Sequence, residues 1–90
     1  MTTSSYDPIA ARFAKACADA RRHLWAQMEQ HGLHEADGWK ISESIRAVQG
    51  GSELVMRPLH LRLQAPPWLE CVVAIDEDTT AIESNCTPEA

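Results

Sequence analysis

The sequence predicts an α+β fold in which one long N-terminal helix packs on a three- to four-stranded antiparallel meander sheet. Apolar residues in the first third of the chain recur at the spacing of a helix. The rest of the chain consists of short segments in which apolar and polar residues alternate, separated by residues that favour turns. Each kind of element exposes one apolar face, so the helix and the sheet are expected to cover each other.

The helix is expected to extend from Asp7 to Gly32. Asp7 is a favourable N-cap, Pro8 suits the first helical position, and Gly32 readily adopts the left-handed conformation that ends a helix. The side expected to face the sheet carries Ile9, Phe13, Cys17, Ala20, Leu24 and Met28. On the polar side, Lys15 and Asp19 are spaced to form an ion pair across one helical turn.

Residues Trp39–Val48 fit two structures. Trp39, Ile41, Ile45 and Ala47 alternate as in a strand, with Glu43 as the exception, whereas Ile41, Ile45 and Val48 also fit one face of a helix. The segment Gln49-Gly50-Gly51-Ser52 that follows suits a two-residue hairpin turn. We therefore favour a strand.

The next strand is expected at Leu54–Leu63. A simple two-residue turn would pair Ile45 with Met56 and Ala47 with Leu54, but the apolar residues would then change face halfway along. One extra residue at Arg57-Pro58, forming a bulge, would correct this. Leu59, Leu61 and Leu63 would then face the helix, and His60, Arg62 and Gln64 would lie on the other side.

The last two strands are expected on either side of an acidic turn at Asp76–Thr79. Leu69, Cys71, Val73 and Ile75 alternate before this turn, and Thr80, Ile82, Ser84 and Cys86 can return on the same face. The length of the turn decides whether Cys71 lies opposite Cys86 or Ser84. Because the chain has three cysteines without close spacing, we expect all three, Cys17 included, to be reduced and buried.

The chain is expected to form one domain at residues 7–86, between a disordered N-terminus at residues 1–6 and a flexible tail at residues 87–90. No run approaches the roughly 18 consecutive apolar residues of a membrane span. The N-terminus also lacks the basic-then-apolar pattern of a signal peptide. These features favour a cytoplasmic protein that does not enter a membrane.

The formal net charge of −5 disfavours direct binding to nucleic acid, because phosphate backbones repel an acidic surface. A basic protein partner would instead be attracted. The densest group of potential metal ligands is His31, His34, Glu35 and Asp37. Because Gly32 interrupts the helix between the two histidines, solvated side chains near a helix end are favoured over a metal site.

Glu43 lies among apolar residues of its expected strand, so its carboxylate needs a raised pKa, a partner or an open sheet edge. We find no catalytic set and no cofactor motif, and we therefore expect neither an enzyme, nor a cofactor, nor a bound metal. The favoured function is a small acidic protein-interaction module, such as an inhibitor, immunity protein or adaptor. The alternative is a small-ligand or metal-binding protein with a site between helix and sheet that uses His31, His34 or Glu43.

The partner-binding residues proposed from the sequence combine an aromatic anchor, positions on the outer sheet face and the acidic turn. They are Trp68, Val72, Arg62, Asp76, Glu77 and Asp78. A helix about 10 Å wide cannot cover four strands that lie about 4.8 Å apart. The sequence therefore also predicts a homodimer formed through the sheet, by its outer face or by an exposed edge.

Overall fold

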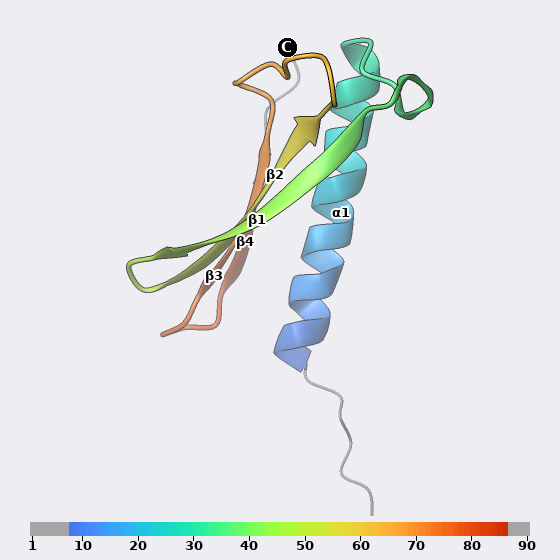
Figure 1. Ribbon diagram of the computed structural model, residues 1–90. Helices are drawn as coiled ribbons and strands as arrows, with labels where there is room; N and C mark the ends of the chain where they lie inside the picture. Colours follow the sequence, from blue (N-terminus) through green and yellow to red (C-terminus); the bar gives the residue numbers. More distant parts are fainter. Residues whose placement is uncertain (1–7, 87–90) are drawn as a thin grey trace, which may run out of the picture.

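The computed structural model describes residues 8–86 and has the predicted α+β fold (Figure 1). The elements are helix α1 (Pro8–Gln30), the short 3-10 helix η1 (Glu35–Asp37), and strands β1 (Lys40–Val48), β2 (Gly51–Leu59), β3 (Cys71–Asp76) and β4 (Ile82–Cys86). The strands form one antiparallel sheet in the order β1-β2-β3-β4, and α1 lies against one face of it. The predicted N-terminus at 1–6, the cap at Asp7 and the tail at 87–90 lie outside the described residues.

Helix α1 ends where the sequence predicts. Gly32 has a φ of +80°, and its N–H donates to the Glu29 carbonyl at 3.1 Å. The N–H of Leu33 donates to the Met28 carbonyl at 2.8 Å, and the Leu33 side chain packs against the core. These two bonds and the apolar contact form a Schellman motif, which satisfies carbonyls that the helix end would otherwise leave unpaired.

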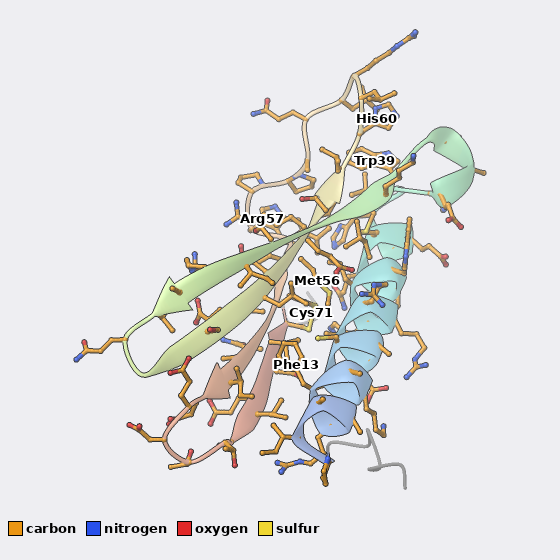
Figure 2. The ribbon with its side chains drawn as sticks, turned by 60° about the horizontal axis from the view of Figure 1, so that its bottom comes forward. Phe13, Trp39, Met56, Arg57, His60 and Cys71 are labelled. Atoms are coloured by element: carbon orange, nitrogen blue, oxygen red, sulfur yellow. A yellow bond between two sulfur atoms is a disulfide. The ribbon has the colours of Figure 1, made fainter. Side chains whose placement is uncertain are left out.

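The core lies between α1 and the inner face of the sheet. Its buried residues are Cys17, Ala20, Leu24, Met28, Trp39, Met56, Leu69, Cys71 and Val73. Phe13, Met56 and Cys71 come from the helix and from two strands and meet in this layer (Figure 2). The predicted apolar stripe of α1 is therefore confirmed. The helix packs mainly on β3 and β4, and the β1–β2 hairpin extends away from it (Figure 1).

Residues 40–48 form a strand, as favoured, but the predicted pairing with β2 is wrong. Ile45 lies opposite Leu54 rather than Met56, and Val48 lies opposite Gly51, so the two turn residues are Gln49 and Gly50. Gly50 takes the left-handed φ of +83° that the turn needs.

Gly51 belongs to the strand for a steric reason. A Cβ atom at this position would collide with the carbonyl oxygen of Ile75 on β3, so only glycine permits this close approach of two strands. The two neighbouring glycines therefore have different roles, and this difference sets the register.

The predicted bulge at Arg57-Pro58 is also wrong. Pairing continues without interruption to Ile41 opposite Pro58 and Lys40 opposite Leu59. Strand β2 ends at Leu59, on the outer face, and the chain then leaves the sheet. The alternation of leucines beyond this point therefore does not build the core. Leu61 and Leu63 lie in the β2–β3 connection instead.

Two ion pairs cross the outer face of the sheet. The Arg46 Nε donates to Glu53 at 2.9 Å, and the Arg57 Nε donates to Glu70 at 3.0 Å. Val72 lies half-buried on the same face, as predicted, with Val55 as its neighbour on β2. Long charged side chains thus cover part of the outer apolar surface.

Another ion pair lies on the helix surface, where Lys15 contacts Asp19 at 3.0 Å, as predicted. The hydrogen bond from Lys15 holds the pKa of the Asp19 carboxyl below its usual value, and Lys15 and Arg22 add electrostatic support. Both side chains are exposed, so this pair contributes little to folding.

Cys71 and Cys86 form a disulfide, so the expectation that they are reduced is wrong for this structure. The four-residue turn at 77–80 places them directly opposite each other, with Cα atoms 4.0 Å apart. Cysteine count and spacing along the chain do not report this cross-strand proximity. Cys17 is free and buried, as expected, and its burial raises the pKa of its thiol.

Gln27 is a buried residue that the helical pattern did not identify. Only 1% of it is exposed, and neither its amide nitrogen nor its amide oxygen has a hydrogen-bond partner among residues 8–86. A polar side chain that loses water without gaining a partner destabilises the folded state.

Replacing Gln27 with methionine should therefore raise the free energy of unfolding, by about 1–3 kcal/mol. Methionine keeps the length and flexibility of the side chain and removes the unpaired amide. Urea denaturation measures the change. Gln30→Met on the exposed last turn is the matched control and should change stability by less than about 0.5 kcal/mol. A lower urea midpoint for Gln27→Met than for the wild type would contradict this account.

Candidate functional site

The segment Leu59–Trp68, which we call the leucine loop, carries an unusual concentration of exposed apolar side chains. Leu61 is 100% exposed, Leu63 58%, Leu59 52% and Trp68 51%. Single exposed leucines are common on proteins, but several within one short segment are typical of interaction surfaces. This loop is therefore the main candidate site.

His60 fixes the conformation of the leucine loop. Its Nδ1 lies 3.0 Å from the backbone nitrogens of Arg62 and Leu63. Both are N–H donors, so Nδ1 must be the acceptor, and a neutral imidazole then carries its proton on Nε2. Nε2 lies 3.0 Å from the carbonyl oxygen of Asp37, to which it donates. His60 thus connects the loop to the segment that follows α1.

The ring of His60 also packs on the core. Its centroid lies 4.9 Å from that of the buried Trp39 ring, and the two side chains lie together beside the start of β1 (Figure 2). Because His60 turns inward, the leucines on either side of it turn toward solvent. The sequence analysis placed His60 on the outer sheet face and missed this role. In the sequence, the leucines could face the helix only if a bulge was added. That requirement was the one indication that the strand does not continue through His60.

Two of the predicted partner-binding residues belong to this loop. Arg62 is exposed between Leu61 and Leu63. Trp68 is half-exposed at the end of the loop, where its ring makes a T-shaped contact with the His31 ring at a centroid distance of 4.8 Å. The loop therefore combines apolar side chains with one cation and one aromatic ring.

The acidic residues lie at the other end of the sheet, in the β3–β4 turn. The Glu77 N–H donates to the Gly50 carbonyl at 2.8 Å, which joins this turn to the β1–β2 turn. Asp76 Oδ1 accepts the Asp78 N–H at 2.9 Å within the turn itself. Beside these turns, Val48, Gly51, Ala74, Asp76, Asp78 and Glu83 help to line an open cavity of about 250 Å³. The structure thus separates Asp76, Glu77 and Asp78 from Trp68 and Arg62, with Val72 between the two groups on the outer face.

Of the alternatives predicted for the Glu43 carboxylate, the structure shows an ion-pair partner. The Arg21 Nε donates to Glu43 Oε2 at 2.9 Å, from the middle of α1 to β1. His31 follows Arg21 by ten positions, a distance of about 15 Å along a helix. Glu43 and His31 are thus held by different neighbours, and the structure does not bring together the residues of the alternative ligand site. No group of three or more metal-ligating side chains is found in residues 8–86.

Replacing His60 with alanine should loosen the leucine loop without unfolding the protein. The N–H groups of Arg62 and Leu63 would lose their acceptor, and each such bond contributes about 1 kcal/mol. Hydrogen exchange at these two amides should become about fivefold to tenfold faster. His34→Ala, at an exposed histidine, should leave their exchange unchanged. Wild-type exchange rates in His60→Ala would show that His60 does not hold the loop.

No protein-family model matches this chain, and searches of curated proteins and of solved structures find no similar protein. Within residues 8–86, no helix is both long and apolar enough to span a membrane. The candidate site is therefore defined by the geometry of this chain alone.

Proposed function

We propose that this chain is a non-catalytic protein-interaction module, such as an inhibitor, an immunity protein or an adaptor, and that the leucine loop is its binding surface. The full exposure of Leu61 carries the proposal. Leu59 and Leu63 lie nearby along the loop, and His60 holds the backbone between them. A fixed loop loses little conformational entropy on binding, so its apolar side chains contribute more to affinity.

The composition of the loop indicates the chemistry of its partner. Leu61 would enter an apolar pocket, with Leu63 and Trp68 as further anchors. Arg62 lies between the leucines, and its guanidinium would pair with a carboxylate at the border of that pocket. The favoured partner is therefore a protein with an apolar groove that has a carboxylate at its border, placed to meet Arg62.

A non-catalytic role is supported by how the candidate chemical groups are engaged. The thiol of Cys17 is buried with a raised pKa, and a neutral thiol is a poor nucleophile. Both ring nitrogens of His60 bond to backbone groups, which leaves neither free to transfer a proton. Arg21 engages Glu43. The net charge of −5 further favours a protein over a nucleic acid as partner.

The cellular compartment is open to a direct test. A cytoplasmic location is the prediction from the sequence, but a Cys71–Cys86 disulfide persists mainly in oxidising compartments. Alkylating the thiols of the native protein in its own cells, before lysis, measures the state of this pair. Protection of two cysteines would favour an oxidising compartment, and alkylation of both would favour the cytoplasm.

We also propose that the chain forms a homodimer through its sheet. Sedimentation equilibrium at tens of micromolar tests this, because the chain has a mass of 10.0 kDa and a dimer has about twice that. A mass of one chain at all concentrations would exclude the dimer. This result would leave the binding role of the leucine loop unaffected, since that loop lies at the end of the sheet.

Site-specific photo-crosslinking tests the main proposal. A photoreactive amino acid at position 61, in cells that produce the protein, should form a covalent adduct with the partner, and the same label at the exposed Ala18 on α1 should not. The partner is then purified, and its affinity for each variant is measured. Leu61→Asp should weaken binding by about 30-fold or more, as expected for an anchor residue. A partner that binds Leu61→Asp as tightly as the wild type would refute the assignment of the loop.

A further inference from the structure

We infer that the exposed edge of β1 pairs with β1 of a second copy, so that two sheets join into one continuous antiparallel sheet. This inference rests on the proposed homodimer and names its interface. It begins from the position of β1, which has β2 on one side and no strand on the other within the described residues.

Strand β1 is a long and exposed edge strand. It has nine residues, whereas β4, the other edge strand, has five. Residues 43–48 are all exposed, because the β1–β2 hairpin extends beyond the area that α1 covers (Figure 1). Proteins usually protect such an edge with a proline, a bulge or several lysines. Here β1 has no proline and no bulge, and Lys40 at its start is its only lysine. Its other two charged side chains, Glu43 and Arg46, are already paired with Arg21 and Glu53 of the same chain.

The hairpin geometry shows which backbone groups are available. The residues that flank a two-residue turn, here Val48 and Gly51, form a hydrogen-bonded pair. Because hydrogen-bonded and non-hydrogen-bonded pairs alternate, the N–H and C=O groups of Glu43, Ile45 and Ala47 point away from β2. The backbone N–H and C=O groups of these three alternate residues are therefore available to bond another strand.

One register suits a two-fold axis. An axis perpendicular to the sheet keeps each side chain on its own face, so residues with the same outward direction must pair. With the axis at Ile45, this residue faces its own copy, and Glu43 faces Ala47 of the second copy. Ile45 is 80% exposed and would be covered by the matching isoleucine. On the outer face, Ser44 would lie opposite Arg46 of the second copy.

Neighbouring registers are less favourable. An axis at Glu43 or at Arg46 would place two like charges directly opposite each other, which destabilises a strand pair. An axis at Ser44 would place Ile45 opposite the carboxylate of Glu43. Of the four registers compared, only the axis at Ile45 avoids both kinds of unfavourable pair. The edge thus offers a self-complementary pairing, which is the property that a symmetric interface requires and that favours a second copy over an unrelated strand.

Two substitutions test the interface. Ile45→Lys places two ammonium groups on the axis, and the side chain is exposed enough for the monomer to tolerate the change. At tens of micromolar, sedimentation equilibrium should give about twice 10.0 kDa for the wild type and about 10 kDa for Ile45→Lys. Ala18→Lys adds the same charge on exposed helix surface and should sediment as the wild type.

A cysteine variant tests the register. In a hydrogen-bonded antiparallel pair the Cα atoms are about 5.5 Å apart, which suits a disulfide. Under mild oxidation Ile45→Cys should form a covalent dimer, whereas Ala47→Cys should not, because it lies opposite Glu43 of the second copy. Covalent dimer from Ala47→Cys but not from Ile45→Cys would overturn the register.

The possible failures can be told apart. A wild-type chain that sediments as a monomer overturns both the homodimer and the edge pairing. A dimer that persists in Ile45→Lys keeps the homodimer but overturns the edge pairing. A monomer whose binding to the cross-linked partner is weakened by Ile45→Lys would assign the edge to that partner and overturn pairing with a second copy.

Discussion

Replacing Leu24 with alanine should lower the free energy of unfolding by about 2–5 kcal/mol. Leu24 has no exposed surface, and it lies in the cluster that joins α1 to β2 and β3. The substitution removes apolar contacts and leaves a cavity that the surrounding backbone cannot fully close. Urea denaturation, followed by circular dichroism of the helix, measures the loss as a lower midpoint with an unchanged slope.

The chain offers a matched control for this substitution. Leu61→Ala removes the same atoms from a side chain that is 100% exposed, and its free energy of unfolding should stay within about 0.5 kcal/mol of the wild type. Equal urea midpoints for the two alanine variants would show that α1 does not form the core with the sheet. A large loss for Leu61→Ala would show that the leucine loop is buried in solution, and would contradict its role as a binding surface.

Loss of the Cys71–Cys86 disulfide should lower the free energy of unfolding by about 3 kcal/mol. The two cysteines are separated by 15 positions, and closing a loop of about that size restricts the unfolded chain by this amount. The double variant Cys71→Ala/Cys86→Ala should therefore unfold at a lower urea concentration than the oxidised wild type. Adding dithiothreitol to the wild type should lower its midpoint, with no effect on the double variant.

Cys17 provides the control for the loss of a buried sulfur. Cys17→Ala also removes a buried thiol, but it leaves the cross-strand bond intact. Its midpoint should remain sensitive to dithiothreitol. An oxidised wild type whose midpoint does not change on reduction would show that the disulfide contributes nothing to stability.

The helix could be predicted because its signals are local. The stop at Gly32 depends on one residue that accepts a positive φ, and the stripe containing Cys17 and Leu24 depends only on spacing. Gln27 shows that the spacing of apolar residues does not identify every buried position of the helix. A residue next to the apolar stripe is buried whatever its polarity, because the width of the contact is set by the sheet and not by the helix.

The sheet was harder to predict because its pairing depends on contacts that are distant in the sequence. The choice between Gly50 and Gly51 as turn residue follows from the Ile75 carbonyl on β3, which the hairpin sequence does not contain. The alternation of leucines from Leu59 to Leu63 resembles a strand, but alternating apolar and polar residues do not by themselves show that the segment is paired or buried. Burial was decided by His60, whose two ring nitrogens find partners in three backbone groups.

The sequence did not show which of the proposed partner-binding residues share a surface, for a related reason. Trp68 and Arg62 were selected separately, and the loop geometry places them on one segment. The acidic turn at Asp76 follows β3, whereas Trp68 precedes it, so the extended strand separates the two. A sequence identifies side chains with suitable chemistry, but the direction of each strand decides which of them share a surface.

Because α1 lies to one side of the sheet, the parts of the sheet should differ in their local stability. The helix and the disulfide both secure β3 and β4, and the outer half of β2 pairs with β3, whereas the outer half of β1 is held chiefly by its pairing with β2. That half should open in brief sub-global fluctuations while the rest of the molecule stays folded. The segment around Ile45 would then sample open conformations more often than Val73, so the least protected part of the fold is also the part with the most freedom to adapt to another chain.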